Sequence, residues 1–369
     1  MTTLKYNREM IKLGRQLAGL TRQALAEKCG LTQPTITRME NGDRQITDEA
    51  AIAIATALHR PLSFLTWDAE IFAPSTVFHR RRASTRVKDV EATNALINYV
   101  RLCVLRMLEG ARLKTRRTMH RIDLGPSCLP ADAARQLRAV WQVPSGPIPN
   151  LVELVESAGI VIWETDEVTA EVDALSLWPI GEDDSRPIVV RVAGKSGDRE
   201  RLTLAHELGH LCLHHLPSND FESEAYAFGS EFLMPEDDIM DALKDLTLQK
   251  AAALKGKWKV SMQAIIRRSR DLGVSNESAY GRLMRELSAK GYRTREPVLI
   301  PSEKPRLLDS IVTRFCQQRD KRGLTSEYLG SLPHYAVPFS KHGEAPQSQC
   351  DVKIQPNDDS GPATLRLFG

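Results

Sequence analysis

The sequence predicts an α+β protein that is mostly helical, and three observations carry this prediction. Short helices with clear caps fill residues 1–72. Three apolar runs, near residues 160, 175 and 190, have the length and composition of buried strands. The last run leads into a helical segment that contains a His-Glu-x-x-His pattern. We therefore expect a helical bundle, then a core with a small sheet, then further helices towards the carboxyl end.

The composition is that of an ordinary globular protein. The chain has 369 residues, which suggests two to three domains, and 42% of them are hydrophobic. It has no run of about 18 apolar residues, so no transmembrane helix is expected, and Met1–Lys5 lacks the apolar core of a signal peptide. The cysteines show no paired spacing, so we expect reduced thiols rather than disulfides or a zinc finger. They are Cys29, Cys103, Cys128, Cys212, Cys316 and Cys350.

Residues 1–72 contain two short helices joined by a tight turn. Thr21 is placed to cap the first helix, which ends at Gly30. Thr32 is placed to cap the second, which stops at Asn41-Gly42. An amphipathic helix over residues 9–17 precedes them. This spacing is typical of a helix-turn-helix, within a bundle that we expect to have five helices.

The second helix of the pair would lie in the major groove of double-stranded DNA. Glutamine and arginine pair bidentately with base edges, and threonine suits phosphates or thymine methyls. The residues expected to contact DNA are Arg22, Gln23, Thr32, Gln33, Thr35, Thr37 and Arg38. The alternative is a small helical bundle that binds a protein rather than DNA.

The segment from Tyr6 to about Asp68 resembles the phage-repressor (XRE, Cro/C1-type) helix-turn-helix domain. The residues in register are Leu17, Leu25, Ala26, Leu31, Ile36, Met39, Glu40 and Gly42. Because domains of this family usually dimerise to bind DNA, the resemblance implies a homo-oligomer, most simply a dimer.

Residues 73–132 are predicted to form a basic connector, helical over residues 85–117. Its cations are Arg80, Arg81, Arg82, Arg86, Lys88, Arg112, Lys114, Arg116, Arg117 and Arg121, with His79 beside them. Such a stretch could follow DNA phosphates next to the helix-turn-helix. A solvated connector surface explains the charge equally well.

Residues 133–240 are predicted to form a second domain with helices and a sheet. We expect helices over 131–143 and 150–158, and strands over 159–163, 173–178 and 187–192.

The next helix contains His206-Glu207-Leu208-Gly209-His210. His206 and His210 lie one turn apart on the same face, so both imidazoles can bind one metal ion. Glu207 lies beside them, placed to take a proton from metal-bound water. This is the arrangement of a zinc-dependent peptidase, in which the preceding strand borders a cleft where a peptide can add along the sheet edge. The alternative is an ordinary amphipathic helix.

A third metal ligand is expected from a second helix, which starts acidic at Phe221 and ends at Pro235. Glu222 and Glu224 lie two residues apart and point to different faces, so only one can be the ligand. Glu222 shares a face with the small residues Ala225 and Gly229, which would let the two helices approach closely, and we favour it. Either carboxylate could instead be a solvated first-turn charge.

His214 and His215 follow the motif by one turn. One of them could be a ligand or a transition-state stabiliser. The alternative places them at the helix carboxyl end, where the helix dipole favours histidine. We prefer this alternative for His215 and leave His214 open. Cys212, at i+2 from His210, is expected to point away from the site.

The run from Asp198 to His210, followed by Glu222-x-x-Ala-x-x-Phe and Leu233-Met234-Pro235, resembles the ImmA/IrrE family of metallo-endopeptidases over residues 135–240. The resemblance implies a zincin-like core of the gluzincin kind and makes Glu222 the third ligand. The family usually has Ala where this chain has Gly229, a departure that does not touch the ligands. We expect one Zn²⁺ per chain, although Mn²⁺ or Fe²⁺ could occupy two histidines and a carboxylate.

The rest of the chain is predicted to be helical and then weakly structured. Residues 241–298 form a helical subdomain in which Ser261 caps a helix resembling the second half of another helix-turn-helix. Residues 299–369 contain a helix over 302–322 and a tail that is weakly structured by composition over 340–362.

These features predict a cytoplasmic, nucleoid-associated bacterial regulator that binds DNA and carries a zinc endopeptidase. The family resemblance implies cleavage of a repressor-type protein that relieves repression in a stress, phage or mobile-element response. His214 and Tyr226 are candidates to stabilise the oxyanion. The alternative is a transcription factor whose peptidase fold is a sensor or scaffold without proteolysis; the intact Glu207 argues against it, because a structural zinc site needs no general base.

Overall fold

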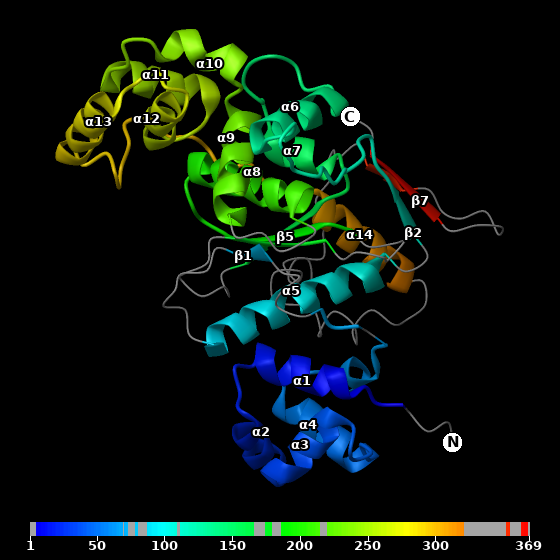
Figure 1. The fold of residues 1–369 in the computed structure, drawn as a ribbon. Helices are drawn as coiled ribbons and strands as arrows, with labels where there is room; N and C mark the ends of the chain where they lie inside the picture. Colours follow the sequence, from blue (N-terminus) through cyan, green and yellow to red (C-terminus); the bar gives the residue numbers. More distant parts are fainter. Residues whose placement is uncertain are drawn as a thin grey trace.

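The computed structural model describes residues 5–320 except 69, 73–77, 80–86, 109–110, 166–173, 179–185 and 215–219, together with strands at 352–354 and 363–367. The chain is α+β and mostly helical, as predicted (Figure 1). None of the described helices is both long and apolar enough to cross a membrane.

The amino-terminal bundle packs four α-helices and one 3-10 helix around an apolar core (Figure 1). They are α1 (Arg8–Leu17), α2 (Arg22–Cys29), α3 (Gln33–Asn41), α4 (Asp48–Ala57) and η1 (Leu62–Thr66). The hydroxyls of Thr21 and Thr32 accept backbone N–H groups at the starts of α2 and α3. Gly30 and Gly42, with φ of 67° and 86°, end these helices in the left-handed region that glycine adopts without strain. The expected bundle is present, with a 3-10 helix as its last member.

Helix α5 (Val87–Met107) lies between the bundle and the rest of the molecule (Figure 1). It contacts α1 on the bundle side and β4, β5 and α14 on the other. The Tyr99 ring stacks on Trp67 with the planes 7° apart, and its hydroxyl accepts a hydrogen bond of 2.9 Å from Arg60. Apolar residues of the bundle, α5 and one face of the sheet therefore form one continuous core.

The prediction of a helix over residues 85–117 is wrong beyond Met107. Residues Ala111–Lys114 form strand β2, which pairs in parallel with β7 (Ala363–Leu367). The alternation of apolar and basic residues in this segment suits a strand, and its partner is distant in the sequence. A third strand, β6 (Val352–Ile354), pairs antiparallel with β7. β6 falls inside the segment 340–362 that we expected to be weakly structured, and the other residues of that segment lie outside the described part.

The main sheet has the strand order β1-β4-β5-β3. Its strands are β1 (Phe78–His79), β4 (Ala174–Leu177), β5 (Ile188–Val192) and β3 (Val161–Thr165), so the three predicted strands are present. β3 and β5 are parallel, whereas β4 is antiparallel to β5. Trp163 and Val190 belong to the core shared with α5, while Ile162 and Val189 belong to the core around α8 (Gly197–Leu213). The sheet is therefore covered on both faces.

The other helices surround α8 in a second apolar core that extends from α6 to α13, across residue 240, where we predicted a domain boundary. They are α6 (Pro130–Val140), α7 (Leu151–Glu156), α9 (Phe221–Leu233), α10 (Glu236–Leu243), α11 (Leu248–Trp258), α12 (Met262–Asp271) and α13 (Glu277–Ala289). The Ser261 hydroxyl caps α12 by accepting from Ala264 N–H, as predicted. The last helix of the described part, α14 (Leu307–Asp320), packs on β3 and α5.

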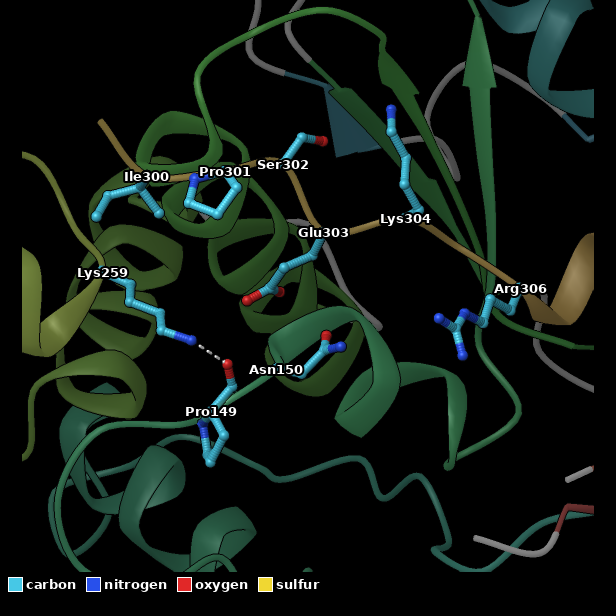
Figure 2. Close-up of a pocket in the computed structure, with 9 residues that line it drawn as sticks. All are labelled: Pro149, Asn150, Lys259, Ile300, Pro301, Ser302, Glu303, Lys304 and Arg306. Carbon is cyan, nitrogen blue, oxygen red and sulfur yellow. Dashed lines mark hydrogen bonds between the residues drawn. The ribbon is translucent and has the colours of Figure 1, made fainter. Parts of the chain in front are cut away.

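The segment before α14 lies across α7 and α8 and is fixed there by Glu303. One carboxylate oxygen accepts the N–H groups of Leu151 and Val152 at 2.8 and 3.1 Å, and the other pairs with the guanidinium of Arg201, which is 2% exposed. Together with Lys259 and Lys304, Glu303 lines a pocket of about 350 Å³ (Figure 2). This carboxylate therefore ties the carboxyl-terminal segment to α7 and α8.

The Glu303→Ala variant should lose about 3 kcal/mol of unfolding free energy, because it leaves the buried Arg201 guanidinium without its anion. The neighbouring Lys304→Ala change should cost less than about 0.5 kcal/mol, because that side chain is 65% exposed. Denaturant unfolding followed by tryptophan fluorescence measures both. Equal effects at the two positions would contradict this role of Glu303.

Candidate metal centre

Helix α8 carries the His-Glu-x-x-His motif through the interior of the molecule. Ser196 precedes it as N-cap residue and His214 follows it as C-cap residue. Most of its side chains are buried, because β4, α6, α7 and α9 all contact it. The motif helix is therefore enclosed rather than amphipathic, and its functional side chains have fixed surroundings.

Two glycines let α8 and α9 approach each other closely. A Cβ atom on Gly229 of α9 would lie 3.0 Å from backbone atoms of Ala205 and His206. A Cβ on Gly209 of α8 would lie 3.0 Å from the backbone of Ala225. The small residues Ala225 and Gly229 thus lie at the helix contact, as expected, and the matching role of Gly209 was missed by the sequence analysis.

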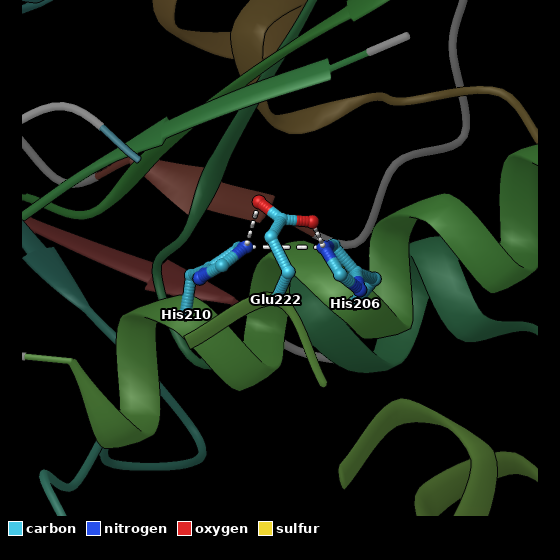
Figure 3. A group of neighbouring side chains, drawn as sticks. All are labelled: His206, His210 and Glu222. Carbon is cyan, nitrogen blue, oxygen red and sulfur yellow. Dashed lines mark hydrogen bonds and ion pairs between the residues drawn. The ribbon is translucent and has the colours of Figure 1, made fainter. Parts of the chain in front are cut away.

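The close approach brings His206, His210 and Glu222 together (Figure 3). The Nε2 atoms of the two histidines lie 3.0 Å apart. The Glu222 carboxylate lies 3.3 Å from Nε2 of His206 and 3.6 Å from Nε2 of His210. Three potential ligand atoms from two helices therefore converge on one point.

This arrangement fits a tetrahedral metal ion. Ligand atoms held about 2.1 Å from Zn²⁺ lie about 3.4 Å from one another, close to the separations found here. Oε1 of Glu222 is buried and accepts no hydrogen bond from the described residues, as a carboxylate oxygen reserved for a cation would be. Two imidazole nitrogens and a carboxylate oxygen form a donor set typical of catalytic zinc, which leaves a fourth position open.

Glu224 has a different partner. Its Oε2 lies 2.9 Å from Nε2 of His214, whose Nδ1 lies 2.9 Å from Nδ1 of His210. A carboxylate only accepts, so His214 donates from Nε2 and accepts at Nδ1, and His210 donates from Nδ1. Burial lowers the pKa of His214, which favours this neutral tautomer. The chain of bonds leaves the lone pair of His210 Nε2 directed at Glu222, as metal ligation requires.

Glu207 is 2% exposed and lies next to the three converging side chains. Burial raises its pKa to about 7, and Glu222 adds to this, while His206 and the Ser176 hydroxyl act in the opposite direction. Its Oε2 has no hydrogen-bond partner among the described residues. A carboxyl group with this pKa can both accept and return a proton near neutral pH.

Ser176 is a site residue that the sequence analysis missed. It lies in β4, is fully buried, and its hydroxyl helps to lower the pKa of Glu207. One signal was available, because Ser176 is the polar residue within the apolar run Ala174–Leu177.

The two candidates for oxyanion stabilisation have other neighbours. His214 lies behind His210, on the Nδ1 side of that ring. The guanidinium of Arg267 lies over the ring of Tyr226, with its Cζ 3.7 Å from the ring centroid. His215 lies outside the described residues. Cys212 is buried in the apolar core, away from the converging ligands as expected. Neither His214 nor Tyr226 is therefore assigned as the oxyanion donor.

The predicted DNA-contacting residues gather on α2, α3 and the turn between them. Gln33 and Arg38 are exposed on α3, and Gln33 donates to Thr37. Gln23 and Thr32 are also exposed, and Thr35 is half-buried beside Thr32. The pair of helices thus presents a polar surface, and its contact with DNA stays a prediction.

Arg22, one of the residues predicted to contact DNA, also forms an ion pair within the bundle. Its Nε lies 2.7 Å from Oε2 of Glu40, a buried carboxylate that also pairs with Arg15 at 2.5 Å. This network ties α1, α2 and α3 together. The Arg22 side chain is still 39% exposed, so the predicted DNA contact is compatible with the ion pair.

The basic connector is only partly described, because Arg80–Arg82, Arg86 and the side chains of Lys88 and Arg112 lie outside the described part. Of the rest, Lys114 and Arg116 are exposed. Arg117 instead donates to the carbonyl of Trp141 and the hydroxyl of Ser157, and Arg121 lies over the Trp178 ring. These two arginines are part of the packing, which favours the connector-surface alternative for them.

Comparison with known protein families gives two matches. Residues 11–65 match the family model described as Helix-turn-helix, and residues 155–270 match the model described as IrrE N-terminal-like domain. No curated protein matches the chain. Both resemblances inferred from the sequence are confirmed, and the second match extends past residue 240 to the end of α12. The chain thus joins a helix-turn-helix domain to a domain similar to metallopeptidases.

The Glu222→Ala variant should lose stoichiometric zinc, because it removes one of three ligands. Glu224→Ala is the matched control two residues away, and it should retain the ion with affinity weakened by roughly 10- to 100-fold, because only the orientation of His210 suffers. Zinc titration with a competing chelator measures both affinities. Loss of zinc in Glu224→Ala with retention in Glu222→Ala would reverse the ligand assignment.

Proposed function

We propose that this chain, with its helix-turn-helix domain and its domain similar to the IrrE type, is a transcriptional regulator with a zinc-dependent endopeptidase site. Its substrate class is a repressor-type regulatory protein, whose cleavage relieves repression during stress, phage infection or mobile-element transfer. The observation that carries the proposal is the convergence of His206, His210 and Glu222 beside the buried Glu207.

The proposed chemistry is peptide hydrolysis. His206, His210 and Glu222 would hold one Zn²⁺, and the ion would supply Lewis acidity for the scissile carbonyl and for the attacking water. Glu207 accepts a proton from the attacking water at its carboxylate and passes it to the nitrogen of the leaving amine. Burial raises the pKa of Glu207 above that of an exposed carboxyl group, which favours its uptake of the proton.

The amino-terminal domain supplies the regulatory context. Gln33 and Arg38 are exposed on the second helix of the pair, where they can contact base edges in a major groove. A peptidase carried by a DNA-binding domain would meet proteins bound at the same operator at high local concentration. This argument favours a regulatory protein over a general peptide as substrate.

We further propose a homodimer in the bacterial cytoplasm, associated with the nucleoid. The support is indirect and comes from the helix-turn-helix domain, because domains of the phage-repressor kind read two half-sites related by a two-fold axis. Dimerisation would also present two peptidase sites at each operator.

The Glu207→Gln variant should keep its zinc and lose peptidase activity by about 100-fold or more, because the proton acceptor is gone while the ligands are unchanged. Wild type and variant are each co-expressed with the repressor-type regulators of the host, and cleavage is followed by mass spectrometry. If both proteins leave every regulator intact yet regulate transcription alike, the domain is a sensor or scaffold and the endopeptidase proposal is wrong.

Gln33→Ala and Arg38→Ala should each weaken operator binding by about 1–3 kcal/mol, because each removes a side chain placed for base contacts. Arg285→Ala on α13 is the charge-matched control, exposed and far from the helix-turn-helix in sequence. Fluorescence anisotropy with operator fragments selected from genomic DNA measures the affinities. Normal binding by both α3 variants would exclude α3 as the recognition helix.

A further inference from the structure

A short strand from the segment between the two domains lies at the edge of the main sheet. β1 pairs antiparallel with β4, with Phe78 opposite Ser176 and His79 opposite Leu175. The strand before the motif helix, β5, pairs with both β3 and β4, so the expectation of a free sheet edge on that strand is wrong. The edge nearest to it is the other side of β4, and β1 occupies that side. One of the two edge strands of this sheet, β1, thus comes from outside the domain similar to the IrrE type, whereas the other, β3, lies within it.

This edge lies next to the candidate metal centre. β4 packs against α8, the helix that carries both histidines and Glu207, and Ser176 of β4 is fully buried. Ser176 is also opposite Val189 of β5, a residue in the core around α8. Phe78 therefore lies opposite a buried residue of the strand that packs on the motif helix.

The segment that supplies β1 is anchored on α5 at its amino-terminal end. The Asn98 amide donates to the carbonyl of Phe72 and accepts from the Phe72 N–H, at 3.1 and 2.9 Å. Asn94 donates to the same carbonyl at 3.2 Å. At its carboxyl-terminal end the segment leads directly into α5, which begins at Val87. Phe72 and Val87, the described residues on either side of this segment, are therefore both fixed at one helix that also contacts β4, which keeps β1 at a high effective concentration near β4.

An exposed strand edge binds extended peptides through its backbone N–H and C=O groups, and each such group serves one strand at a time. A peptide substrate that reached Glu207 along β4 would need the groups that β1 uses. β1 and an external strand are therefore mutually exclusive on this edge.

We propose that the β4 edge is the peptide-binding edge of the site and that the chain's own inter-domain strand, Phe78–His79, fills it in the free protein. A protein substrate must displace this strand before cleavage. The inference rests on the proposed endopeptidase function and adds its regulation. Substrate entry is thereby linked to the segment that joins the peptidase-like domain to the DNA-binding domain.

The first test measures strand pairing without any peptidase activity. The double variant Phe78→Pro/His79→Pro removes two backbone donors, whereas Phe78→Ala/His79→Ala changes the same side chains and keeps them. Hydrogen exchange over residues 174–177 should be at least tenfold faster in the proline variant than in wild type, and near wild type in the alanine variant. Equal exchange in all three proteins would overturn the proposal.

The second test uses the zinc-loaded full chain and fluorescein-labelled casein as an unstructured substrate. If β1 is paired about nine-tenths of the time, KM for casein should fall roughly tenfold in the proline variant, with kcat unchanged. Zinc content and thermal unfolding should match wild type. Cleavage with the same KM in both proteins overturns the inference and leaves the endopeptidase function standing.

Two further outcomes are informative. A chain that cuts itself between residues 73 and 86 makes β1 a substrate rather than a competitor, which also overturns the inference. If neither protein cuts casein or any repressor, the endopeptidase proposal fails. The exchange experiment still reports independently whether β1 occupies the edge.

Discussion

The close approach of α8 and α9 is the constraint on which the candidate metal centre depends. Two ligands come from α8 and one from α9, so the spacing of the helices decides whether all three reach one ion. Gly209 and Gly229 set that spacing, because each faces backbone atoms of the opposite helix. The same contact positions Glu224 against His214 and so orients His210. Ligand geometry and ligand orientation therefore follow from one helix–helix interface.

The second organising feature is α5, which shares its apolar core with both domains. Its Tyr99 packs with Trp67 of the bundle, while other residues of the helix pack against the outer face of the sheet. The face of the sheet opposite α5 supports α8 and the motif. One layer of side chains on α5 therefore separates the bundle from the sheet. The backbone of Phe72 is also hydrogen-bonded to Asn98 of this helix.

Local sequence patterns predicted the parts of the site that lie within one element. His206 and His210 share a helix, so their convergence needs only the helical repeat, and the caps at Thr21 and Thr32 need only adjacent residues. Glu222 was preferred over Glu224 because it shares a face with Ala225 and Gly229. The role of Glu224 could not be deduced, since its partner His214 belongs to another element whose orientation is set by packing.

Contacts between distant segments escaped the sequence analysis for the same reason. Ser176 reaches Glu207 only after β4 packs on α8, and β1 was unrecognised because two residues carry no periodicity. β2 was assigned to a helix because its partner β7 lies near the carboxyl end. The pairing of Glu303 with Arg201 joins residues 102 apart. Such interactions depend on the assembled fold, whereas propensity and spacing describe neighbours in the chain.

The central claim is that His206, His210 and Glu222 hold a single metal ion beside Glu207. Diffraction from zinc-loaded crystals at energies on both sides of the zinc absorption edge tests it most directly. We expect one anomalous peak per chain, about 2.0–2.2 Å from Nε2 of each histidine and from a Glu222 oxygen. Glu224 should remain bonded to His214. A peak coordinated by Glu224, or the absence of any peak between α8 and α9, would contradict the account.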